Sequence, residues 1–216
     1  MNKNILIVIG SPRCERSSSD IISNNLESKL RDSNMNCSKI YLEKMINKKT
    51  AIIEKVDKSD VIILISPIYE NSLPGTVLEF LETINEDKNK LTNKDRKMFV
   101  ITNSGFPEVE ASKSAITTCS LFARDMNFKW LGGIGVTPGT LMENGELGKT
   151  YKKLDASLNL IAKDIRDDKE ISKEAFELVS KTFISPLIYR FGGRILQNKT
   201  IKNIGKDCFF AKPFEI

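Results

Sequence analysis

The sequence contains no histidine. This absence excludes imidazole metal ligands, histidine acid–base chemistry, and nucleophilic catalysis by Ser-His-Asp or Cys-His arrangements. The four cysteines, Cys14, Cys37, Cys119 and Cys208, are scattered and form no C-x-x-C pair. That spacing argues against a disulfide framework, a zinc site and a cysteine-ligated iron–sulfur cluster. We therefore interpret the cysteines as reduced, mostly structural thiols and predict no metal site.

Long apolar runs are also missing, since none approaches the roughly 20 residues that span a bilayer. The chain starts Met1-Asn2-Lys3 and shows no small-residue cleavage site after its first apolar run, so we expect a cytoplasmic protein with no membrane span. The net charge of +5 is modest for 216 residues, and acids interleave with most of the bases. Nucleic acid is not implied as a partner. The length suits one main domain.

Three short apolar runs stand out, at residues 5–9, 61–65 and 98–101. Their apolar residues are continuous rather than alternating, which is typical of strands covered on both faces. Each run precedes a segment in which apolar residues recur at helical spacing. With weaker strands at 37–42 and around 130–136, the pattern predicts an α/β fold in which helices cover both faces of a doubly wound, five-stranded parallel sheet.

A long amphipathic helix closes the predicted main domain, which spans residues 1–166. Residues 167–216 would form a helical C-terminal extension. Between residues 183 and 206 this extension carries five basic residues and no acidic one, a composition also found in membrane-surface helices. Because Gly192-Gly193 weakens a continuous helix, we prefer packing of the extension on its own domain or on a dimer partner.

The loop after the first strand reads Gly10-Ser11-Pro12-Arg13-Cys14-Glu15-Arg16-Ser17-Ser18-Ser19. Its four hydroxyls and two guanidiniums, with the amides of a helix N-terminus, are suitable phosphate ligands. The loop lacks the second glycine and the lysine of a Walker A motif, and Pro12 stands where a Rossmann fingerprint needs glycine. A terminal monophosphate is therefore favoured, and capping of the helix by the serines is the alternative.

Two further loops should reach the same crevice, because ligands of open parallel sheets bind beyond the carboxyl ends of the strands. The loop at 66–75 is stiffened by two prolines and could orient a ring. The loop at 102–108 offers small polar residues, Gly105 for close approach, and Phe106 to flank a flavin or the nicotinamide. Taken alone, each of these two loops would also suit an ordinary turn. In the loop at 66–75, Tyr69 would then pack on the core.

The paired motifs Gly10-Ser11-Pro12-Arg13 with Arg16-Ser17-Ser18-Ser19, and Pro67-Ile68-Tyr69 with Asn71-Ser72-Leu73-Pro74-Gly75, resemble the NAD(P)H-dependent FMN reductase family. The resemblance is spread over roughly residues 3 to 140. It implies a flavodoxin-like fold with strand order 2-1-3-4-5, noncovalent FMN and, usually, a homodimer. Hydride would pass from NAD(P)H to FMN and on to a flavin, quinone, azo or nitro acceptor. No catalytic residue is named, because the isoalloxazine ring supplies the redox chemistry.

The resemblance also implies which residues bind FMN. Those at the phosphate would be Ser11, Arg13, Ser17, Ser18 and Ser19. Those at the ribityl chain and ring would be Pro67, Ile68, Tyr69, Asn71 and Ser72, with Ser104 and Gly105 on the other side. The chain lacks the compact cysteine motif of the related iron–sulfur flavoproteins, so no cluster is expected.

Two other functions are open at this point. A flavodoxin-type electron carrier would bind FMN without NAD(P)H turnover, but such carriers are generally strongly acidic, whereas this chain has a pI of about 8.9. A flavin-binding sensor could use Cys14, between Arg13 and Arg16, as a low-pKa thiol. An unreactive loop cysteine is the preferred interpretation of Cys14.

Overall fold

The computed structural model describes residues 3–92, 94–137, 147, 151–181 and 186–211. The chain forms two compact units, Met1–Phe183 and Ile184–Ile216. The first unit contains the sheet, and the second contains the last two helices.

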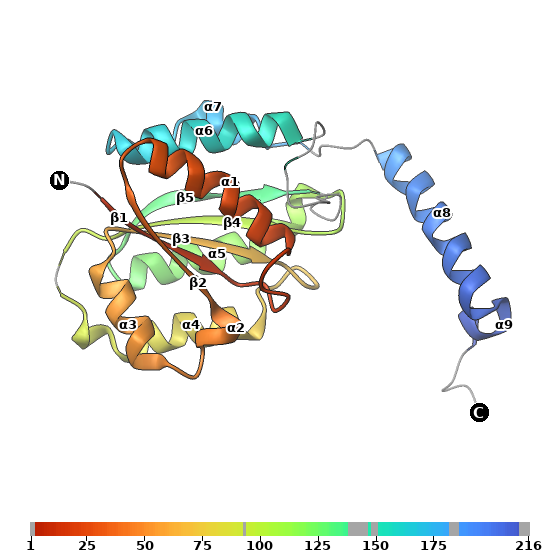
Figure 1. Cartoon of the computed structure of the whole chain (residues 1–216), viewed down its shortest axis with the longest axis horizontal. Helices are drawn as coiled ribbons and strands as arrows, with labels where there is room; N and C mark the ends of the chain where they lie inside the picture. Colours follow the sequence, from red (N-terminus) through yellow and green to blue (C-terminus); the bar gives the residue numbers. More distant parts are fainter. Residues whose placement is uncertain (1–2, 93, 138–146, 148–150, 182–185, 212–216) are drawn as a thin grey trace. The chain divides into compact units, whose positions relative to one another are not determined.

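Among the described residues, five parallel strands form one sheet with the order β2-β1-β3-β4-β5 (Figure 1). The strands are β1 (Asn4–Ile9), β2 (Asn36–Tyr41), β3 (Val61–Pro67), β4 (Lys97–Asn103) and β5 (Lys129–Val136). The predicted flavodoxin-like strand order is thus confirmed. The order reverses between β1 and β3, and this reversal opens a crevice at their carboxyl ends.

Side chains of successive strand residues point to opposite faces of the sheet. In β1, Ile5, Ile7 and Ile9 belong to one core cluster, whereas Leu6 and Val8 belong to the other. All five are buried. A strand covered on both faces needs an unbroken apolar run, which explains the run that the sequence shows.

Helices cover both faces of this sheet (Figure 1). One face is covered by α1 (Ser18–Asp32), α6 (Lys152–Arg166) and α7 (Lys173–Glu177). The other is covered by α2 (Leu42–Met45), α3 (Lys49–Lys58), α4 (Gly75–Glu86) and α5 (Lys113–Asp125). Helices α2 and α3 lie between β2 and β3, where no helix was predicted. Short 3-10 helices, η1 (Lys88–Lys90) and η2 (Val109–Ser112), precede β4 and α5.

The core of the first unit continues past the end of α6. Ile171, Ala175 and Val179 are buried in the cluster that also contains α1 and α6. The Ser157 hydroxyl donates a hydrogen bond to the carbonyl oxygen of Ala175 at 2.7 Å. The first unit therefore takes in residues beyond the predicted boundary at 166, because their side chains complete the apolar layer over the sheet.

The second unit consists of α8 (Pro186–Ile204) and α9 (Lys206–Phe209), which meet at Gly205. Gly205 has φ +85°, a conformation that glycine adopts without strain. Helix α8 runs without a break through Gly192 and Gly193, although this pair was expected to weaken it. No described helix of either unit is long and apolar enough to cross a membrane. Packing of this extension on the domain or on a partner stays a prediction.

Candidate functional site

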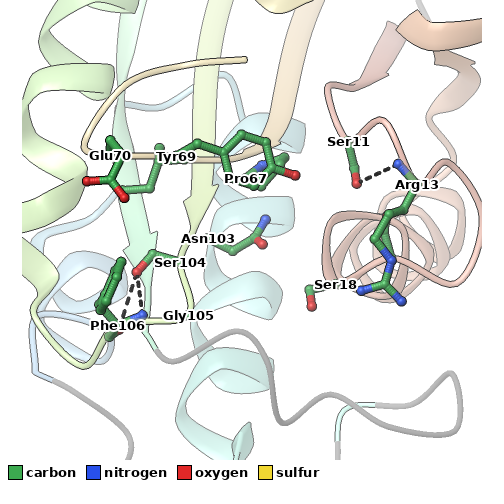
Figure 2. Close-up of a pocket in the computed structure, with 12 residues that line it drawn as sticks. Ser11, Arg13, Ser18, Pro67, Tyr69, Glu70, Asn103, Ser104, Gly105 and Phe106 are labelled. Carbon is green, nitrogen blue, oxygen red and sulfur yellow. Dashed lines mark hydrogen bonds between the residues drawn. The ribbon is translucent and has the colours of Figure 1, made fainter. Parts of the chain in front are cut away.

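A pocket of about 330 Å³ lies at the carboxyl ends of β1, β3 and β4 (Figure 2). Nine of the predicted binding residues line it: Ser11, Arg13, Ser17, Ser18, Pro67, Ile68, Tyr69, Ser104 and Gly105. Glu70, Asn103 and Phe106 also line it. The predicted Ser19, Asn71 and Ser72 are not among the lining residues. The three loops that the sequence singled out therefore meet at one site, but not with all of their predicted residues.

The first loop is folded tightly around Ser11, which is buried. The Ser11 hydroxyl accepts a hydrogen bond from the Arg13 amide at 3.3 Å, and the Ser11 carbonyl accepts one from the Cys14 amide at 3.0 Å. Cys14 and Arg16 have φ values of +48° and +63°. The chain reverses at these two residues. As a result Arg13 lines the pocket and Arg16 does not.

Gly10 allows the first loop to begin where it does. A Cβ at this position would lie 2.4 Å from Val77 Cγ2 and 2.7 Å from Ser66 Oγ. The Gly10 amide donates a hydrogen bond to the Ile65 carbonyl at 2.9 Å. Glycine is therefore required by the close approach of β3 and α4 rather than by a left-handed backbone.

Ser17 caps helix α1, as the alternative interpretation of the serine run proposed. Its hydroxyl accepts a hydrogen bond from the Asp20 amide at 3.2 Å and donates one to the Cys14 carbonyl at 2.7 Å. The Ser19 hydroxyl accepts a hydrogen bond from the side-chain amide of Asn103 at 2.8 Å. Ser19 thus links the first loop to the end of β4. Ser17 and Ser19 both shape the pocket through contacts within the protein.

Asp20 ties the base of the loop to β2. Its carboxylate accepts hydrogen bonds from the Arg16 amide at 3.0 Å and from the Tyr41 hydroxyl at 2.7 Å. Burial of Tyr41 and its bond to this carboxylate raise the pKa of the Tyr41 phenol. Tyr41 is therefore a neutral donor that holds Asp20 in place.

Cys14 does not have the properties of a low-pKa thiol. It is buried, and this burial raises the pKa of its thiol, an effect that the nearby Lys44 only partly opposes. The adjacent acids Glu15, Glu43 and Asp20 also raise this pKa. Neither flanking arginine contributes to this shift, in which desolvation is the largest cause. Cys14 thus lacks the low pKa that the sensor hypothesis assigned to it, and its burial agrees with the interpretation as an unreactive loop cysteine.

The second loop turns back on itself after Ile68. The amides and carbonyls of Tyr69 and Ser72 exchange two hydrogen bonds of 2.9 Å, and Glu70 and Asn71 between them have positive φ values of +48° and +65°. Two central residues with positive φ define a type I′ turn. This turn places Tyr69 and Glu70 at the pocket and leaves Asn71 and Ser72 outside its lining. Tyr69 is 51% exposed, so it is not packed on the core.

The third loop is joined to the second by the bond from the Ile68 amide to the Asn103 carbonyl, at 2.9 Å. The Ser104 hydroxyl accepts a hydrogen bond from the Phe106 amide at 3.0 Å. This bond fixes a turn that leaves Phe106 55% exposed. Figure 2 shows Tyr69, Ser104 and Phe106 on one side of the pocket and Ser11, Arg13 and Ser18 on the other.

Two lining residues, Asn103 and Glu70, were missed by the sequence analysis. Asn103 is the last residue of β4 and is buried. Its side chain is held by the hydrogen bond to Ser19, a residue 84 positions away in the sequence. The polar pair Thr102-Asn103, which follows the apolar run at the carboxyl end of β4, was the available signal. Glu70 lines the pocket because of the type I′ turn, which its own sequence neighbours do not specify.

The site fits FMN in the chemistry of its groups. One side offers the Arg13 guanidinium, serine hydroxyls and the N-terminus of α1, which are donors suited to a phosphate. The Arg13 guanidinium is exposed and makes no hydrogen bond or ion pair with any residue that the structure describes. The other side offers aromatic and backbone groups suited to a flat ring. The volume falls within the range of small-molecule pockets.

Comparison with known families identifies the protein's relatives. Residues 3–127 match the sequence model of the family described as NADPH-dependent FMN reductase. The chain belongs to this family. It is therefore a flavoprotein oxidoreductase with FMN as cofactor and NAD(P)H as co-substrate. No curated protein matches the sequence.

Solved structures share the fold of this FMN reductase at low identity. An NADH:FMN oxidoreductase in its apo form is 14% identical, with a TM-score of 0.61 over 81% of this chain and 94% of that one. A flavone reductase is 12% identical, with a TM-score of 0.61 over 99% of both chains. An FMN-dependent NADH-azoreductase from Bacillus anthracis, in complex with FMN, is 10% identical, with a TM-score of 0.56 over 76% and 99%.

Proposed function

We propose that this FMN reductase passes reducing equivalents from NAD(P)H, through bound FMN, to a flat aromatic or quinonoid acceptor such as a flavin, quinone, azo or nitro compound. For a quinone the balance is NAD(P)H plus H⁺ plus quinone to NAD(P)⁺ plus hydroquinone. FMN supplies the hydride acceptor and donor chemistry. The observation that carries the choice of acceptor is the pair of exposed aromatic rings, Tyr69 and Phe106, that lines the pocket.

The two sides of the pocket would divide the binding of FMN between them. We assign the phosphate to Ser11, Arg13 and Ser18, because hydroxyls at a helix N-terminus and a guanidinium with no partner among the described residues favour a dianion. We assign the ring to Pro67, Ile68 and the backbone at Ser104 and Gly105. Ser17 and Ser19 would support the phosphate loop indirectly, through the contacts that already occupy their hydroxyls.

Tyr69 and Phe106 would contact the acceptor as well as the cofactor. Large aromatic side chains on soluble proteins are usually more buried than these two, which are 51% and 55% exposed. Ring stacking contributes about 0.5–1.5 kcal/mol beyond area burial. We therefore expect the Phe106→Ala and Tyr69→Ala variants to raise the KM for a quinone about 2- to 12-fold, with FMN retained.

The test begins with a visible spectrum of the purified protein, followed by steady-state oxidation of NADH and of NADPH. Acceptors would include free flavin, a quinone, an azo dye, a nitroaromatic compound and a flavone, the last prompted by the flavone reductase neighbour. Leu121→Ala is a control for loss of an exposed apolar side chain that does not line the pocket. A protein that retains FMN but oxidises neither nucleotide would be an electron carrier, and the proposal would fail.

We also propose that the enzyme is a homodimer, as the family resemblance implies. Sedimentation equilibrium of the FMN-loaded protein would give the mass directly. A monomeric mass at all accessible concentrations would contradict this proposal without affecting the proposed reaction. The predicted cytoplasmic location is a separate question, which fractionation of cells would answer.

A further inference from the structure

Glu70 is a charged residue of the pocket to which the proposed reaction gives no role. It is exposed, and its carboxylate makes no hydrogen bond or ion pair with any residue that the structure describes. Arg13 and Glu70 are the two charged residues among those that line the pocket. Figure 2 shows Glu70 on the same side as Tyr69 and Phe106, opposite Arg13. The two charges therefore stand on different sides of the site.

The turn that carries Glu70 is not made of the residues that such a turn favours. A type I′ turn needs positive φ at both central residues and is most often built from Asn-Gly. Here these residues are Glu70, with φ +48°, and Asn71, with φ +65°. Asparagine tolerates this conformation, but it is unfavourable for glutamate. Strained backbone of this kind is found most often at functional sites, which agrees with a functional role for Glu70.

Binding of FMN would change the balance of charge in the pocket. Under the proposed function the Arg13 guanidinium binds the phosphate, which carries between about 1.5 and 2 negative charges at neutral pH. Glu70 is then the charge in the lining that stays without a counterion. It lies on the side where Tyr69 and Phe106 would contact the acceptor. An acceptor with a negative group would therefore meet a like charge there, which is unfavourable.

We propose that Glu70 selects acceptors by charge, so that the enzyme prefers neutral or cationic acceptors to anionic ones. This inference rests on the proposed function, because it assumes that the acceptor binds beside Tyr69 and Phe106. Specificity often depends on an unfavourable contact with the rejected molecule as well as on favourable contacts with the accepted one. A quinone of either charge gains the two electrons and two protons that the reduced flavin loses, and Glu70 affects only its binding.

The kinetic test compares two acceptors that share a ring system, 1,4-naphthoquinone and its anionic 2-sulfonate. Glu70→Gln removes the charge of the side chain and keeps its size. In this variant of the FMN-loaded enzyme we expect kcat/KM to rise about 2- to 5-fold for the sulfonate, the effect of one exposed charge pair, and to stay within about 1.5-fold for the neutral quinone. Glu70→Lys should raise the value for the sulfonate further, because it replaces repulsion with attraction. High salt should reduce these differences, because it screens exposed charges.

A binding measurement separates this inference from the proposed reaction. The ligands are 2-naphthoate, an anion, and 2-naphthamide, its neutral analogue, neither of which accepts hydride. Titration of the oxidised, FMN-loaded protein gives both dissociation constants from the change in the flavin absorption spectrum. Glu70→Gln should tighten the binding of naphthoate about 2- to 5-fold and leave that of naphthamide unchanged. A protein that oxidises neither NADH nor NADPH would still give this result, so the two proposals can fail independently.

Glu79→Gln is the matched control, because Glu79 is an exposed acid of α4 that does not line the pocket. It removes the same charge and should leave the preference between anionic and neutral ligands unchanged. Equal effects of Glu70→Gln on the two kinds of ligand would overturn the proposal, because Glu70 would then act on the shape of the turn. No effect on either ligand, or an equal effect of Glu79→Gln, would also overturn it. Far-ultraviolet circular dichroism and the FMN content check that each variant is folded and loaded.

Discussion

Arg13 and Arg16 lie three residues apart in the phosphate loop, and the structure gives them different roles. Arg13 lines the pocket and Arg16 does not, although both are exposed. We predict that Arg13→Gln weakens FMN binding and that Arg16→Gln does not. Because Arg13 has no other partner among the described residues, its loss should leave the stability of the protein unchanged.

The size of the effect follows from the exposure of the guanidinium. A hydrogen bond to a charged group contributes about 1.5–3 kcal/mol, and an exposed pair belongs at the lower end because solvent and salt screen it. We therefore expect Arg13→Gln to raise the Kd for FMN about tenfold at low salt. Arg16→Gln should change it less than about twofold.

Fluorescence titration of the apoprotein with FMN measures both constants, and titration with riboflavin supplies the internal control. Riboflavin lacks the phosphate, so its affinity should be the same in the wild type and in the Arg13→Gln variant. Equal losses for FMN and riboflavin would show that Arg13 acts on the shape of the loop and not on the phosphate. Equal losses in the two arginine variants would refute the assignment of Arg13 as the phosphate ligand.

Three further predictions concern stability and reactivity. Gly10→Ala should lower the free energy of unfolding in urea by about 1–3 kcal/mol, because its Cβ would lie 2.4 Å from Val77. The control Gly75→Ala, whose Cβ would have no atom within 4 Å, should leave this free energy unchanged. A Gly10→Ala variant as stable as the wild type would contradict the close packing. Alkylation of the native protein should modify the exposed Cys208 first and leave Cys14 unmodified, as peptide mass mapping would reveal. Hydrogen bonds from Lys97 and Lys3 lower the pKa of Asp168 to about 2 from 3.8. The contribution of this carboxylate to the free energy of unfolding is therefore present above pH 3.8 and disappears as the pH falls toward 2. The Asp168→Asn variant should therefore lose less unfolding free energy than the wild type between pH 3.8 and 2. The difference should be less than about 1 kcal/mol, since the carboxylate is largely exposed. Identical pH dependence of the unfolding free energy in the two proteins would contradict this.

The sheet itself was predictable because burial on both faces leaves a direct trace in the sequence. The runs at 5–9 in β1, 61–65 in β3 and 98–101 in β4 are apolar at every position, and few structures other than a covered parallel strand produce such a run. Helices α2 and α3 left a weaker trace, since α3 buries only Ile52, Ile53 and Val56. The end of the first unit was harder to predict, because Ile171 and Val179 reach the core from irregular or short segments.

The sequence by itself determined the parallel sheet, the loop that suits a phosphate and the family to which the chain belongs. Only the tertiary structure decided which side chains of each loop reach the pocket. That selection depends on positive φ values at Cys14, Arg16, Glu70 and Asn71, and on the Ser19–Asn103 contact between distant segments. Local composition specifies which groups are present, but the direction of a side chain depends on the backbone turns and on the neighbouring strands that hold them.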